Sequence, residues 1–175
     1  ARGNVSNTGL MMARLCYDLL MEKGRDALAA VERHEVTPAL EDVVEATIYL
    51  SGLGFENGGL AAAHAVNDGF AQEPQAHGMY HGEKVAFGTL VQLVLEKAPQ
   101  EELEQVLAFL RDTGLPLTLA QLGVKEIVPE TLKKVAEAAV VPTQSTKNLR
   151  ADITAQEVYD AILEADRIGR DYLAR

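Results

Sequence analysis

The sequence contains few of the residues that mark several classes of protein. Its 175 residues include one cysteine, Cys16, and no tryptophan. A single cysteine cannot form a disulfide within the chain, which excludes a disulfide-stapled scaffold and favours a reducing, cytoplasmic compartment. No apolar run approaches the roughly 20 residues of a membrane-spanning helix. No basic segment followed by an apolar core opens the chain, so we expect no signal peptide.

Basic residues are also scarce. The chain has 16 Lys and Arg against 26 Asp and Glu, which gives a formal net charge of −10. Proteins that follow the phosphates of nucleic acids need a basic surface, and so do proteins that adhere to anionic membranes. We therefore expect neither a nucleic acid nor a membrane as partner.

The length and composition are ordinary for one globular domain, and we predict a single domain over residues 1–175. Apolar residues make up 47% of the chain and charged residues 24%. A chain of this length buries about 70% of its unfolded surface, enough for an independent core. The sequence opens with Ala1-Arg2-Gly3 and no initiator methionine, from which we expect further residues upstream.

Helical periodicity dominates, and no convincing period-two strand is present. Apolar residues three, four and seven positions apart predict helices, with glycine and proline at their ends. We expect helices over residues 9–23, 38–50, 82–97 and 100–113, one that has Pro129 in its first turn and an apolar pattern over 132–140, one that begins near Gly58 and Gly59, and one that follows Thr154. The segment 117–122 is expected to form a short turn and 141–152 a loop. The fold class is therefore all-α, with seven to nine helices.

Two details of these helices can be checked against a structure. The first helix is apolar nearly all round from Leu10 to Met21 and is expected to be buried on most faces and to stop at Gly24. In the last helix, Thr154 and Glu157 have the spacing of a capping box, in which each side chain accepts from the other's backbone amide.

The glycine-rich segment 51–59 admits two interpretations. A dinucleotide-binding turn needs Gly-x-Gly-x-x-Gly between a strand and a helix. Here Gly52 and Gly54 are followed by Asn57 and no strand precedes them, so we favour a helix end, a tight turn and a second, closely packed helix. Phe55 stands among these glycines, where it either walls a pocket or caps the packing of the next helix.

Three of the four histidines, His64, His77 and His81, fall within one 18-residue window. Imidazole is a common ligand for zinc and iron. His77 and His81 have i, i+4 spacing, but Gly78 and Gly82 weaken a helix there. Metal ligands and ordinary structural histidines both remain open, and none of the nearby carboxylates is singled out as the third ligand that zinc usually takes.

Two longer blocks carry a resemblance. They read Gly-Gly-Leu-Ala-Ala-Ala-His over residues 58–64 and His-Gly-Glu-Lys-Val-Ala-Phe-Gly over residues 81–88. Together with stretches such as Leu15-Cys-Tyr-Asp18 and Gly114-Leu-Pro116, they resemble the bacterial glycerol dehydrogenases of the iron-containing (group III) alcohol dehydrogenase superfamily. The resemblance extends over nearly all 175 residues.

The resemblance implies an all-helical, dehydroquinate-synthase-like domain that binds metal, which is the C-terminal half of a larger enzyme. An N-terminal Rossmann-like domain that binds NAD is expected to be absent from this chain. The implied reaction is the NAD-dependent oxidation of glycerol, or a related small diol, to dihydroxyacetone, with zinc as a Lewis acid. A homo-oligomer is also implied.

The resemblance assigns roles at three positions. His64 and His81 match the two zinc-ligand histidines, and Phe55 matches an aromatic residue against the substrate. The third ligand is an aspartate that no residue here matches, so it is expected before Ala1. Asn67 and Lys147 depart from the family pattern, which often has histidine at both positions.

Two functions follow as alternatives. In the first, the chain is the C-terminal portion of a glycerol dehydrogenase and is inactive by itself. In the second, it is a stand-alone, non-catalytic helical module or a split-enzyme subunit derived from the same family.

Overall fold

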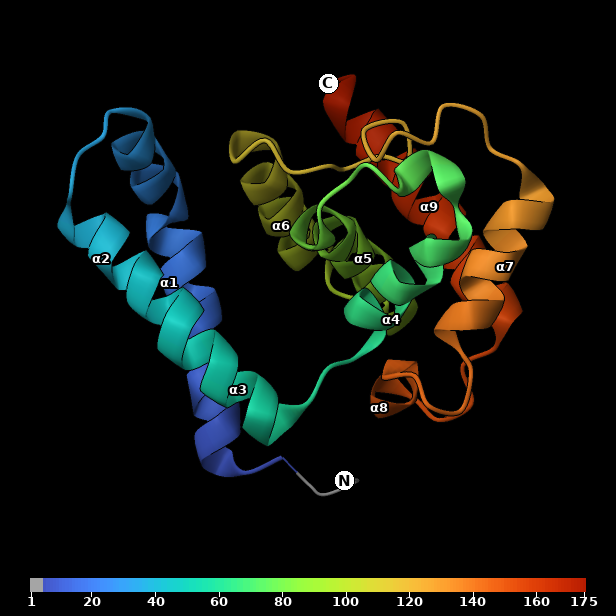
Figure 1. Cartoon of the computed structure of the whole chain (residues 1–175), viewed down its shortest axis with the longest axis horizontal. Coiled ribbons are helices and arrows are strands. Elements are labelled where there is room, and N and C mark those ends of the chain that lie inside the picture. The colour runs from blue at the N-terminus through green and yellow to red at the C-terminus, as the bar shows by residue number, and fades with distance from the viewer. Residues whose placement is uncertain (1–4) are drawn as a thin grey trace. The chain divides into compact units, whose positions relative to one another are not determined.

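The computed structural model describes residues 5–175, and every regular element in that range is helical (Figure 1). The all-α prediction is confirmed, and the helices α1 to α9 agree with the seven to nine expected. The start of the chain, Ala1-Arg2-Gly3, lies outside the described residues. Within residues 5–175, no helix is long and apolar enough to cross a membrane.

The chain divides into two compact units, Ala1–Gly59 and Leu60–Arg175, and each is described by itself. The single domain predicted over residues 1–175 remains a prediction.

The first unit is a helical hairpin. Its elements are α1 (Asn7–Glu32), α2 (Pro38–Glu45), the π-helical segment η1 (Ala46–Leu50) and α3 (Ser51–Gly58). α2, η1 and α3 form one continuous helical run, which packs back along α1 (Figure 1). As expected, Thr37 begins the second arm, where its side chain accepts from the backbone amide of Leu40 at 3.3 Å.

Small residues let the two arms approach closely. The buried positions are Gly9, Ala27, Ala30, Ala46, Leu50 and Gly54. Cys16 is half-buried and donates from Sγ to the carbonyl oxygen of Ala46 at 3.6 Å, while burial raises the pKa of its thiol. A thiol in this position packs and bonds as a structural residue does.

Three expectations for the first unit are wrong. α1 continues through Gly24 to Glu32, because a single glycine costs a helix only about 1 kcal/mol, and Ala27 and Ala30 extend its buried stripe. The second arm does not end at Ser51 and Gly52, because the π turn absorbs an extra residue and the helix runs on to Gly58.

The third correction concerns burial. Leu10, Met11 and Leu15 are 59%, 72% and 49% exposed, so α1 is not buried on most faces. The second arm also has an apolar groove of about 580 Å³, lined by Val36, Leu40, Glu41, Val44, Glu45, Ile48 and Tyr49. Proteins that function as monomers rarely expose a large apolar surface of this kind.

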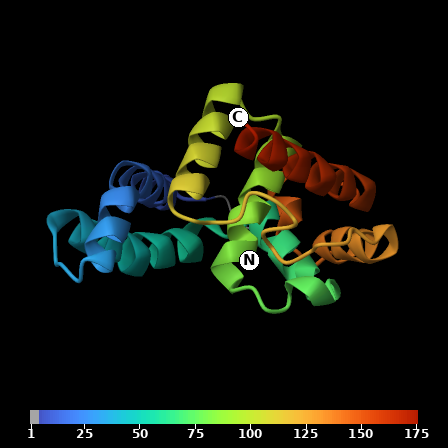
Figure 2. The same cartoon turned by 90° about the horizontal axis from the view of Figure 1, so that it is seen from above.

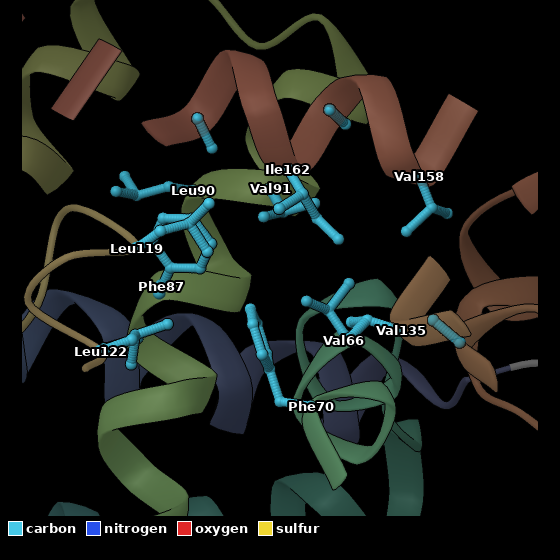
Figure 3. Close-up of a cluster of buried hydrophobic side chains, with 14 of the residues drawn as sticks. Val66, Phe70, Phe87, Leu90, Val91, Leu119, Leu122, Val135, Val158 and Ile162 are labelled. Carbon is cyan, nitrogen blue, oxygen red and sulfur yellow. The ribbon is translucent and has the colours of Figure 1, made fainter. Parts of the chain in front are cut away.

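The second unit holds the main hydrophobic core. Its helices are α4 (Ala62–Gly69), α5 (His81–Glu96), α6 (Gln100–Asp112), α7 (Pro129–Ala139), α8 (Thr146–Leu149) and α9 (Ala155–Leu173), with the 3-10 turns η2 (Phe70–Gln72) and η3 (Pro74–Ala76). α4 packs on α5 and α7, and α9 packs on the same two helices (Figure 1 and Figure 2). Figure 3 shows side chains from these helices meeting between them.

Aromatic and aliphatic side chains fill this core. Phe70 and Phe87 pack edge to face with their ring centres 6.1 Å apart, and Leu119 and Leu122 come from the turn before α7 (Figure 3). The predicted capping box is confirmed: the amide of Glu157 donates to the Thr154 hydroxyl, and the Glu157 carboxylate accepts from the Thr154 amide. The loop predicted over 141–152 contains the single turn α8.

Glycines set how closely three pairs of segments approach in the second unit. A Cβ added at Gly69 or Gly88 would lie 2.4 Å from a backbone carbonyl oxygen of α7 or α4, and one at Gly169 would lie 1.9 Å from that of Leu117. These contacts are too short for any side chain, so the backbones touch directly at each glycine.

We predict that Gly169→Ala lowers the free energy of unfolding by about 1–3 kcal/mol, because α9 must move away from Leu117. The matched control is Gly82→Ala in α5, where an added Cβ meets nothing within 4 Å. That change should raise stability by about 0.4–1 kcal/mol. Urea unfolding followed by circular dichroism measures both, and equal stability of the Gly169 variant and the parent chain would contradict the packing argument.

Candidate functional site

His64 and His81 lie close together within the second unit. His64 lies in the first turn of α4 and His81 is the first residue of α5. Their ring centres are 5.4 Å apart and the ring planes are inclined by 49°. The other histidine of the window lies elsewhere: His77 Nε2 is 3.1 Å from the carbonyl oxygen of Ala71, to which it donates.

The close packing of α4 and α5 sets this distance. Gly88 lies against Ala63, the residue before His64, so that the two helix backbones touch. Beside this contact, the Ala63 amide donates to Gln92 Oε1 at 3.0 Å. Backbone amides in the first turn of a helix have no acceptor within the helix, and here a side chain of α5 supplies one.

The first turn of α5 is fixed in a different way. The amide of Tyr80, the residue before His81, donates to Glu83 Oε2 at 2.6 Å. The carboxylate therefore satisfies an amide at the helix N-terminus, where negative charge is also favoured by the helix dipole. His81 itself is exposed, whereas His64 is half-buried.

Burial lowers the pKa of His64, and the positive charge that His81 can carry lowers it further; Asp68 partly opposes the two. The neutral imidazole is the form that binds metal, because its free nitrogen keeps a lone pair. The surroundings of His64 therefore favour the ligating form.

The spacing of the rings agrees with a shared metal ion. With Zn–N bonds of about 2.0–2.1 Å and tetrahedral angles, two imidazoles on one zinc have ring centres about 5 Å apart. The observed separation is 5.4 Å. No cluster of three or more His, Cys, Asp or Glu side chains suited to a metal occurs among residues 5–175. The two imidazoles therefore fit as part of a donor set, but a usual zinc site needs a further ligand.

Phe55 lies on α3 in the first unit and is 48% exposed. Gly52 and Gly54 lie inside the same helix, and Gly59 ends it with a φ of +74°. The segment is therefore a helix and its C-cap, not a phosphate-binding turn that follows a strand.

Sequence reasoning overlooked the residues that hold the histidines. Gly88 entered only as part of a matched block, and neither Gly88 nor Gln92 was given a role of its own. A glycine in the middle of an otherwise regular helix is a signal of close helix packing. Asn67, one of the departures from the family pattern, is buried and donates to Asp68 Oδ1 at 3.0 Å.

We predict that His81→Gln raises the pKa of His64 but leaves it below the ordinary value of 6.5, because burial is the larger cause of the shift. NMR titration of the imidazole protons measures this, and His77→Gln is the matched control that should leave the pKa unchanged. Because the folded pKa is below the unfolded one, His64 lowers stability as the pH falls through 6.5. A His64 pKa above 6.5 in either chain would contradict the assignment.

Comparisons with known proteins find several glycerol dehydrogenases. No family model matches the chain. The chain is 54% identical to a glycerol dehydrogenase of Escherichia coli O6:H1 over 173 residues, which is 99% of this chain and 47% of that protein. It is 46% identical to a glycerol dehydrogenase of Thermotoga maritima, over 94% of this chain and 45% of that protein.

Solved structures agree. The crystal structure of a probable glycerol dehydrogenase from Sinorhizobium meliloti matches with a TM-score of 0.91 and 44% identity, over 95% of this chain and 47% of the other. The glycerol dehydrogenase of Schizosaccharomyces pombe matches with a TM-score of 0.93 and 40% identity, over 97% and 43%. The chain thus spans about half the length of the curated relatives it matches. Over nearly its whole length, the chain therefore corresponds to the C-terminal helical portion of the glycerol dehydrogenases to which it is similar.

Proposed function

We propose that the chain supplies the metal-binding half of an NAD-dependent glycerol dehydrogenase, which oxidises glycerol or a related small diol. The observation that carries the proposal is the pair formed by His64 and His81, with ring centres 5.4 Å apart. The names of the relatives support the substrate, since they are glycerol dehydrogenases at 46–54% identity.

His64 and His81 would hold one zinc ion, together with an aspartate from outside this chain. When bound there, zinc supplies a Lewis acid that polarises the alcohol oxygen. The part of His64 is to present a neutral imidazole, which its burial favours. Phe55 would take the substrate-binding role that the resemblance assigns to it, and its side chain is 48% exposed.

The remaining parts of the reaction need residues beyond this chain. A separate α/β half would hold NAD, which when bound supplies the acceptor for the hydride of the alcohol. The exposed apolar side chains of the first unit, such as Leu10 and Met11, support a chain that docks onto further protein. We also infer a homo-oligomer in the cytoplasm, in keeping with the resemblance and with the single, unpaired Cys16.

The histidine assignment is tested by joining this chain to the N-terminal half of the E. coli relative. We predict that His64→Ala or His81→Ala in this chimera removes bound zinc and lowers NADH formation from glycerol by at least about 100-fold, since each removes a metal ligand. Metal content by mass spectrometry and absorbance at 340 nm measure the two effects.

His77→Ala is the control for that experiment, because the His77 ring bonds to the carbonyl of Ala71 instead of facing His81. It should keep both zinc and activity. A His64 or His81 variant that keeps both would refute the metal assignment.

For the 175-residue chain by itself, we predict no NADH formation with glycerol and weak zinc binding, because two histidines fall short of the usual three protein ligands. A coupled assay with added NAD⁺ and Zn²⁺ measures the turnover. Clear activity would contradict the division of the reaction between two halves. A chimera that stays inactive with zinc bound would favour the non-catalytic module.

A further inference from the structure

The chain that precedes α4 is held by the segment around α8. Ser145 Oγ donates to the carbonyl oxygen of Ala61 at 2.7 Å, and Asn148 Nδ2 donates to that of Leu60 at 2.8 Å. More than 80 residues separate the partners of each bond. The two carbonyls lie immediately before α4, three and four residues before His64.

The same segment also contacts α4 one turn beyond His64. Gln144 Nε2 donates to Asp68 Oδ2 at 3.2 Å, and the other oxygen of Asp68 accepts from Asn67. Residues 64 and 68 lie on one face of the helix because they are four positions apart. The segment 144–148 therefore bonds to the chain on both sides of His64.

This segment is itself anchored in the second unit. Thr146 is fully buried, and its hydroxyl donates to the carbonyl oxygen of Ala139 at the end of α7. Lys147 Nζ donates to the carbonyl oxygen of Ile153 at 3.2 Å. α7 also packs directly on α4. The segment therefore adds a second connection, which links the end of α7 to the N-terminal end of α4.

The N-terminal end of α4 needs such support. The helix has eight residues, and helices shorter than about 12–15 residues are marginal by themselves. No side chain caps it at Ala61. His64 is in its first turn, so any fraying there moves the imidazole directly.

We propose that Ser145 and Asn148 are positioning residues that fix the first turn of α4, and with it the separation of the His64 and His81 rings. The inference rests on the proposed function, in which these two rings hold one metal ion. Gln92 and Gly88 contact this turn from α5, whereas Ser145 and Asn148 bond to the two residues that precede it.

The test is Zn²⁺ affinity of the 175-residue chain by calorimetry, with thermal unfolding of the metal-free chain measured in parallel. Ser145→Ala and Asn148→Ala should each weaken Zn²⁺ binding by about three- to tenfold, the range that the loss of one hydrogen bond covers. Ser145→Thr keeps a hydroxyl and should restore the parent affinity.

Thr113→Val is the matched control. Its hydroxyl donates to the carbonyl oxygens of Phe109 at 2.8 Å and Leu110 at 3.4 Å, which both belong to α6 and not to α4 or α5. Thr113→Val loses the bonding of one hydroxyl to backbone carbonyls, as Ser145→Ala does. Its melting temperature should therefore fall by about as much as that of Ser145→Ala, while its Zn²⁺ affinity stays unchanged.

The outcomes separate this inference from the proposed function. If His64→Ala binds Zn²⁺ as well as the parent chain does, the metal assignment fails and this inference fails with it. If His64→Ala weakens binding but Ser145→Ala and Asn148→Ala do not, only the positioning role is refuted. If Thr113→Val weakens binding equally, the effect is one of general stability and the positioning role is again refuted.

Discussion

The direct contact between the backbones of α4 and α5 is the constraint on which the candidate site depends. At Gly88 an added Cβ would lie 2.4 Å from the carbonyl oxygen of Ala63, so only glycine allows the observed approach. His64 follows Ala63 at once, and His81 begins α5 two turns before Gly88. Two imidazoles 5.4 Å apart are therefore a consequence of how closely two helices pack.

The core of the second unit makes that contact rigid. Phe70 follows α4, Phe87 precedes Gly88, and their rings pack edge to face in the interior (Figure 3). α7 and α9 close the core from the other side. Because protein interiors are close-packed, a shift of α4 against α5 would disturb all of these contacts. The histidines thus stand at the edge of a core that resists change in their spacing.

Within residues 5–175, the candidate metal ligands that lie together are the two histidines. In the same range, apolar side chains of the first unit such as Leu10 and Met11 are exposed. Both features agree with a chain that matches 43–47% of the length of its relatives. A buried stripe can be read from a sequence, but the element that buries it need not belong to the same stretch. The pattern from Leu10 to Met21 was therefore interpreted correctly as apolar and wrongly as buried.

The sequence by itself determined the helical class, most helix ends and the capping box of Thr154 and Glu157, because these depend on neighbours a few residues apart. The resemblance selected His64 and His81 as the metal ligands. Spacing alone left His77 open as a ligand together with His81. Only the tertiary structure decided that α1 passes Gly24, that α2 runs through a π turn into α3, and that Ser145 and Asn148 bond to the start of α4. These outcomes depend on contacts between residues far apart in the chain, where packing energy exceeds local preference.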